Sequence, residues 1–215
     1  AMLGLRLIDM KIELGVDAKG VLRVADVIDN DSWRLRTAEW VELSKENFRQ
    51  GHDLGEVEEK YQLVAKLVEG FRIPKQGIII WRGSDKDEID LSPDHDDLTE
   101  ILTLSGHKSP QRCLRELESL LARYPEGGVI IALVGKSNGL GPLLAARTSW
   151  PVIAVCASAK SFPDDLWSSL RMPSDVPLLV ASDQKNAKLA ALNILAAKNP
   201  VAYMRRQLRI ETFDD

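Results

Sequence analysis

The sequence predicts an α/β fold with a doubly wound parallel sheet in three αβα layers, preceded by an amino-terminal β-hairpin and helix appendage. Short apolar runs alternate with helical patterns after residue 77, which is typical of a parallel sheet covered on both faces. A glycine-rich loop directly follows the run at 129–134. The expected strands are 78–81, 101–104, 129–134, 152–155 and 178–181. The expected helices are 113–124, 142–147, 164–170, 186–198 and 201–208.

Length and composition exclude several classes of protein. The 215 residues suit one compact domain with an appendage, or two small domains. The net charge of -4 gives no basic surface for nucleic acid. Neither a signal peptide nor an apolar run of the roughly 20 residues that span a bilayer is found, so we expect a cytoplasmic protein without a membrane partner. The two cysteines and three histidines lack metal-ligand spacing, so no metal is expected.

Residues 3–35 have the alternating pattern of β structure. Asp9, Lys11 and Glu13 alternate with apolar residues, so they share one face of a strand, and Asp26 lies on the strand that faces it. The two strands of this expected hairpin are 5–14 and 21–28. A lysine among carboxylates has the groups to hold a metal ion and a phosphate. A solvated face with weak ion pairs explains the same pattern, so both readings stay open here.

A helical region follows the hairpin. Apolar residues recur at helical spacing over 38–72, with a break at 51–53 between a shorter and a longer helix. Pro74 ends this region. The expected division is therefore an amino-terminal segment, 1–72, and an α/β domain, 76–212.

Loops after three neighbouring strands are the candidate site of the α/β domain. They are 82–85, 105–110 and 135–142, and the last is called the central loop below. Parallel strands bring such loops to the carboxyl edge of the sheet, where open α/β folds bind ligands. Glycine allows close approach of a ligand, and helix starts attract phosphate. His107 can move a proton near neutral pH, although a helix-cap role also explains a histidine in this loop.

The motifs of this domain resemble the aminoimidazole ribonucleotide (AIR) carboxylases. The central loop, G-K-S-N-G-L-G-P, is similar to the family's G-R-S-N-G-L-G-P. Residues 165–174, D-L-W-S-S-L-R-M-P-S, resemble D-V-W-S-S-L-R-L-P-S of its animal branch. Residues 105–110 are similar to S-A-H-[KR]-x-P, and 82–85 resemble a shortened G-S-x-S-D. The resemblance implies reversible carboxylation of AIR to carboxy-AIR with CO2 in purine biosynthesis, using no ATP, biotin or metal.

The same resemblance implies roles for individual residues and an assembly. The implied catalytic positions are His107, Asn138 and Ser137. The implied substrate-binding positions are Ser84, Asp85, Ser105, Lys108, Lys136 and Gly139. Asn138 with Gly139 would shape the CO2 pocket. The family forms octamers with sites at subunit junctions, and the alanine-rich helix at 186–197 allows close packing, so we expect a homo-oligomer, possibly the octamer of the family.

The amino-terminal segment resembles SAICAR synthetase, the ligase that follows AIR carboxylase in purine synthesis. Residues 7–15, L-I-D-M-K-I-E-L-G, are similar to its L-[IV]-D-x-K-x-E-x-G signature, and 25–35 are similar to the animal form. The resemblance implies that Lys11, Glu13 and Asp26 contact ATP and its Mg²⁺. The long amino-terminal half of that family does not precede the signature. We therefore expect a remnant ATP site, without ligase activity unless the missing half is supplied.

Departures from the family pattern leave competing hypotheses. The first loop is shortened, an acidic run fills 88–97, and Lys136 replaces an arginine that binds phosphate with two hydrogen bonds. One hypothesis is an active AIR carboxylase-like enzyme. Another is a catalytically degenerate member that binds a ligand or serves in assembly, and a third is a fragment of a bifunctional enzyme. If segment 82–97 folds away from His107, the enzyme is favoured; if the segment covers the site, the binding module is favoured.

Overall fold

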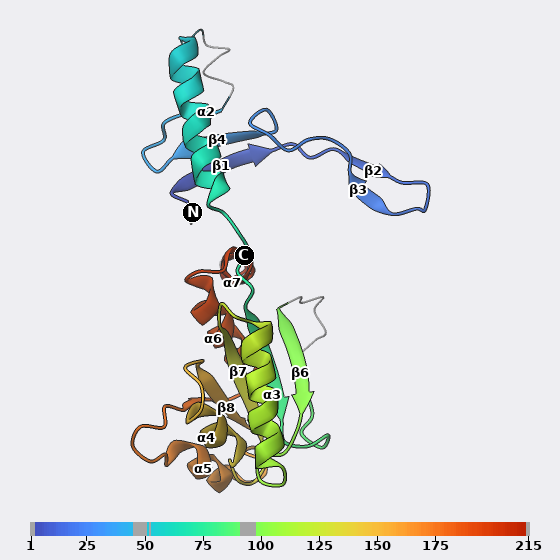
Figure 1. The fold of residues 1–215 in the computed structure, drawn as a ribbon, viewed down its shortest axis with the longest axis vertical. Helices are drawn as coiled ribbons and strands as arrows, with labels where there is room; N and C mark the ends of the chain where they lie inside the picture. The colour runs from blue at the N-terminus through green and yellow to red at the C-terminus, as the bar shows by residue number, and fades with distance from the viewer. Residues whose placement is uncertain (1–2, 45–50, 52, 91–97, 214–215) are drawn as a thin grey trace. The chain divides into compact units, whose positions relative to one another are not determined.

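The computed structural model describes residues 3–44, 51, 53–90 and 98–213 (Figure 1). The chain divides into two compact units, unit 1 at 1–72 and unit 2 at 73–215. Within the described ranges, no helix is both long and apolar enough to cross a membrane.

Unit 2 is built on a parallel sheet of five strands. The strands are β5 (Gly77–Arg82), β6 (Thr99–Thr103), β7 (Gly128–Val134), β8 (Val152–Cys156) and β9 (Leu179–Ala181). Their order is β6-β5-β7-β8-β9, and every neighbouring pair is parallel. The predicted fold class is confirmed. From β5 the chain crosses to β6 on one side, and from β7 it crosses to β8 on the other side. The direction of the strand order therefore reverses between β5 and β7, which is the topological switch point of the sheet.

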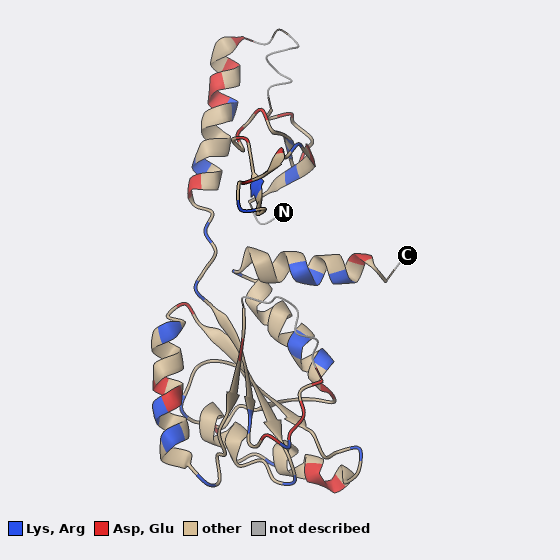
Figure 2. Cartoon of the chain, turned by 90° about the vertical axis from the view of Figure 1, so that its right-hand side faces the viewer, with Lys and Arg blue, Asp and Glu red and all other residues tan. Residues whose placement is uncertain are grey.

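Helices cover both faces of this sheet, because alternate residues of each strand point to opposite sides. One face packs Ile131 and Leu133 of β7 against α6 (Gln184–Ala196) and the start of α7 (Pro200–Glu211). The other face packs Ile130 and Ala132 against α3 (Pro110–Arg123) and α4 (Leu140–Ala145). All of β7 is buried, whereas charged residues occur along α3, α6 and α7 (Figure 2).

The segment between β8 and β9 differs slightly from its prediction. The helix expected at 164–170 is a 3₁₀ turn, η1 (Pro163–Leu166), followed by one turn of α-helix, α5 (Trp167–Leu170). The Ser168 hydroxyl donates to the Asp165 carbonyl, which joins the two turns. This side-chain bond to the backbone suits a short, irregular helix.

The hairpin predicted for unit 1 is present but shorter than predicted, and residues 5–10 pair with a different strand. The strands are β1 (Leu5–Met10), β2 (Leu14–Val16), β3 (Leu22–Val24) and β4 (Trp33–Thr37). β1 pairs with β4, and β2 pairs with β3, both antiparallel. β4 is the better partner for β1 because Leu35 joins Leu5 in a small core with Leu43 and Val64. The shorter hairpin keeps the predicted turn, where Asp17 accepts bonds from the amides of Lys19 and Val21.

The helical region of unit 1 is partly confirmed. Helix α2 (Leu54–Glu69) begins after the Asp53 cap and buries Val57 and Val64, as its spacing predicts. Residues 38–44 are not helical, which corrects the start of the predicted shorter helix. Trp40 has a φ of 68°, which a helix does not accept, and its ring lies beneath the guanidinium of Arg36. Residues 45–50 and His52 lie outside the described part of the chain.

Candidate functional site

Strands β5, β6 and β7 end side by side at one edge of the sheet. Arg82 lies opposite Thr103 of β6 and Leu133 of β7 in the parallel register. The three predicted loops therefore start from neighbouring points at the topological switch. Here the connections diverge to opposite faces, which opens a crevice for ligands in folds of this kind.

The second loop contacts the central loop through two glycines. A Cβ atom at Gly139 would lie 2.4 Å from Nε2 and Cε1 of His107, so the imidazole rests directly on the glycine backbone. A Cβ at Gly106 would lie 2.7 Å from the Cα of Leu140. Neither position has room for a side chain. The structure thus brings His107 and the central loop together, and the histidine remains exposed.

Asn138, which is predicted to shape the CO2 pocket, is buried and bonded to neighbouring residues. The residue is 6% exposed. Its Nδ2 donates to Ser169 Oγ at 2.9 Å, and its Oδ1 accepts from the Gly141 amide at 2.7 Å. A buried amide with these partners holds the loop in place. Replacing it would leave polar groups unpaired, so we expect the substitution to destabilise the fold.

The polar side chains around this contact remain available to a ligand. Ser137, Lys136 and Lys108 are all exposed. Ser105 Oγ accepts from the Lys108 amide at 3.3 Å, which shapes the second loop before α3 begins. Two lysines near a helix start provide a positive field for a phosphate.

In the first loop, the two residues predicted to bind substrate make bonds to the loop itself. Asp85 has a side chain 83% exposed and pairs with Arg82, Oδ1 to Nη2 at 2.6 Å. Ser84 Oγ accepts from the Lys86 amide at 3.0 Å. Ser84 and Asp85 therefore each bond to another residue of the same loop.

Asp87 lies between the first loop and the central loop, and the sequence analysis did not name it. Its carboxylate oxygens would lie 3.5 Å from a Cβ at Gly135 and 3.6 Å from a Cβ at Gly83. Partial burial raises the pKa of this carboxyl above its ordinary value. Residues 83–87, G-S-D-K-D, fit G-S-x-S-D without any deletion, except that Lys86 replaces the serine. That spacing is the signal by which the sequence could have identified Asp87.

The described part of the acidic segment is attached to the α6 side of the sheet. Gln184 Nε2 donates to the Glu88 carbonyl at 2.8 Å, and its Oε1 accepts from the Asp90 amide at 2.9 Å. Ile89 packs against the core beneath α6. His107 precedes α3, on the other side of the sheet. Residues 82–90 therefore lead away from the histidine, and 91–97, with His95, lie outside the described residues.

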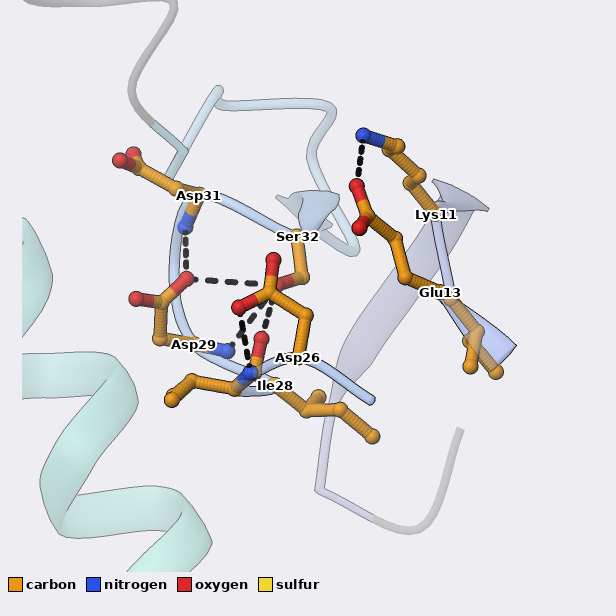
Figure 3. A pocket seen from close by; sticks show the side chains of 9 residues that line it. Lys11, Glu13, Asp26, Ile28, Asp29, Asp31 and Ser32 are labelled. Atoms are coloured by element: carbon orange, nitrogen blue, oxygen red, sulfur yellow. Dashed lines mark hydrogen bonds and ion pairs between the residues drawn. The ribbon is translucent and has the colours of Figure 1, made fainter. Parts of the chain in front are cut away.

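A second candidate site lies in unit 1 (Figure 3). Lys11, Glu13 and Asp26 line a hollow of about 290 Å³, together with Asp29 and Ser32. The ammonium of Lys11 bonds Glu13 Oε1 at 2.5 Å, and this bond with the nearby negative charge raises the pKa of Lys11. The structure thus brings together the three residues predicted for ATP and Mg²⁺.

The carboxylates of this hollow are too dispersed to bind a metal ion on their own. Across the described residues, no three His, Cys, Asp or Glu side chains are grouped to hold a metal. Asp29 is also committed locally, since its Oδ1 accepts from the Asp31 amide at 2.9 Å. Magnesium is commonly held by one or two carboxylates together with phosphate and water. The residues therefore fit Mg²⁺ carried by a nucleotide.

Comparison with known proteins gives a match for each unit. The AIR carboxylase family matches residues 97–211, and the SAICAR synthetase family matches residues 1–68. The probable multifunctional protein ADE2 of Caenorhabditis elegans is 34% identical, over 92% of this chain and 50% of its own length. The bifunctional phosphoribosylaminoimidazole carboxylase/phosphoribosylaminoimidazole succinocarboxamide synthetase of Drosophila melanogaster is 32% identical, over 94% and 51%. The chain therefore spans about half the length of these relatives.

A solved structure supports the fold of unit 2. PurE from Treponema denticola superposes with a TM-score of 0.56 at 23% identity. The match covers 65% of this chain and 92% of that chain. At this identity the likeness bears on the fold alone.

Proposed function

The chain belongs to the AIR carboxylase family, and on that premise we propose that unit 2 catalyses the reversible carboxylation of AIR to carboxy-AIR with CO2. The observation that supports this proposal most is the contact of His107 with Gly139 in the central loop. This contact places a titratable imidazole beside exposed backbone, lysines and a serine at the switch point of the sheet. Purine biosynthesis is the corresponding metabolic role.

The proposed mechanism uses orientation and one proton transfer. The enamine-like C4 of AIR attacks the carbon of CO2, and a C–C bond forms. The C4–H bond then breaks, its electron pair returns to the imidazole ring of AIR, and the proton passes to a nitrogen of His107. Lys108 and Lys136 attract the phosphate, while Asp87 can accept a bond from a ribose hydroxyl. Holding two small reactants together supplies much of the rate enhancement.

The first loop bears on the choice between an enzyme and a binding module. Its described continuation, 88–90, is attached to α6 rather than to the loop of His107. The His107 side chain is exposed, which favours the enzyme over the binding module. The altered first loop, in which Lys86 replaces a serine, is the feature that favours the degenerate module.

Decarboxylation of carboxy-AIR, followed by ultraviolet absorbance, tests the proposed reaction. We expect His107→Asn to lower kcat by roughly 10²- to 10⁴-fold, because the variant loses its proton-transfer group. His52→Asn, in the other unit, is the matched control and should keep the wild-type rate. A wild-type chain without turnover, or a His107→Asn variant with full turnover, would refute the proposal.

We also propose that the chain forms a homo-oligomer. Two alanines of α6, Ala187 and Ala191, are buried in the core of unit 2, and Ala190 and Ala196 pack against that core. Helix α7 offers a better surface, because Met204 and Leu208, one turn apart, are more than half exposed. We expect a sedimentation mass that is a multiple of 23.9 kDa at micromolar concentration. The mass of one chain would contradict this.

For unit 1 we propose weak binding of ATP together with Mg²⁺ in the hollow of Lys11. Support comes from the ammonium and carboxylates that converge there, in a region similar to SAICAR synthetase. In a calorimetric titration of ATP with Mg²⁺, Lys11→Met should weaken binding, because it removes the cation that faces the phosphates. Lys19→Met, in the turn of the β2–β3 hairpin, should bind as the wild type does. Equal affinities in all three proteins, or no binding by any, would exclude this site.

A further inference from the structure

We infer that Ser168 and Ser169 of α5 are positioning residues for the proposed carboxylation, because they anchor Asn138 and thereby set Gly139 beneath His107. This inference rests on the proposed function of the central loop and assigns it a support that lies about 30 residues further along the chain. Neither serine is expected to touch the substrate.

Two adjacent hydroxyl groups hold one residue of the central loop. Ser168 Oγ accepts from the Asn138 amide at 3.0 Å and donates to the Asp165 carbonyl at 2.8 Å. Ser169 Oγ accepts from Asn138 Nδ2 at 2.9 Å. Ser169 is 1% exposed, so no water competes for this bond. Both the backbone and the side chain of Asn138 are therefore fixed to α5.

The anchored asparagine also fixes the start of α4. Its Oδ1 accepts from the Gly141 amide, three residues on, as a helix-capping side chain does. A Cβ at Gly141 would lie 2.7 Å from Asn138 Nδ2, so the amide packs flat on that glycine. Gly139 lies between these two restrained residues. Its Cα is the surface on which the His107 ring rests.

This arrangement separates positioning from substrate affinity. Both lysines expected to attract phosphate are exposed, and Lys108 lies in the second loop, outside the segment that α5 anchors. The distance between His107 and the central loop does depend on α5, through Asn138. A displacement of about 1 Å at a reacting group lowers turnover far more than it lowers binding. Loss of either serine should therefore reduce kcat and leave KM nearly unchanged.

The test compares four single variants in the decarboxylation assay, well below their unfolding temperatures. Ser168→Ala and Ser169→Ala should each lower kcat by roughly 10- to 100-fold, with KM within about threefold of wild type. Ser168→Thr keeps an Oγ acceptor and should restore kcat. Ser174→Ala, an exposed serine further along the same segment, is the matched control. Wild-type kcat in both alanine variants would overturn the inference, and so would a loss confined to KM or to thermal stability.

A spectroscopic readout tests the positioning without relying on activity. The His107 Cε1–H resonance, identified by its loss in His107→Asn, reports the ring's contact with Gly139. It should shift in Ser168→Ala and Ser169→Ala and stay in place in Ser174→Ala. If the wild type shows no turnover but the shift is seen, the proposed reaction fails and the positioning stands. If the resonance does not move, the positioning fails whatever the activity.

Discussion

The close contact between the His107 imidazole and the backbone of Gly139 is the constraint on which the site of unit 2 depends. It requires a residue without a side chain at 139, and it requires the second and central loops to start from the same edge of the sheet. The parallel order β6-β5-β7 meets the second requirement, because the β6 and β7 loops flank that of β5. The buried strand β7 makes this edge rigid. The central loop is thereby carried on a fixed frame.

Support for the central loop comes from four separate parts of the chain. Gly106 of the second loop packs against Leu140, and the serines of α5 accept hydrogen bonds from Asn138. Cys156 at the end of β8 contributes a weaker bond, with Sγ 3.7 Å from the Gly135 carbonyl. Asp87 closes the Gly135 end from the first loop. The residues that determine this geometry are thus spread over more than half of unit 2, although the chemistry is assigned to a few side chains.

Much of unit 2 was predictable from the sequence, and the reasons are physical. Strands buried on both faces are continuous apolar runs, and β5, β7 and β8 lie within about two residues of their predicted bounds. The pairing of β1 with β4 was not predictable from alternation, because it depends on the shared core of Leu5 and Leu35. The inward turn of Asn138 depends on hydroxyl groups about 30 residues away, which no local pattern reveals. Asp87, by contrast, was readable from motif spacing alone.

The most direct measurement of the central claim is the kcat for carboxy-AIR decarboxylation in two alanine variants of the central loop. A methyl group at Gly139 would displace the His107 ring, whereas one at Gly135 would meet Asp87 at 3.5 Å, an ordinary contact. The account predicts that Gly139→Ala loses roughly 10- to 100-fold in kcat while Gly135→Ala stays near wild type. Equal rates in the two variants would show that the contact between His107 and Gly139 does not form the active site.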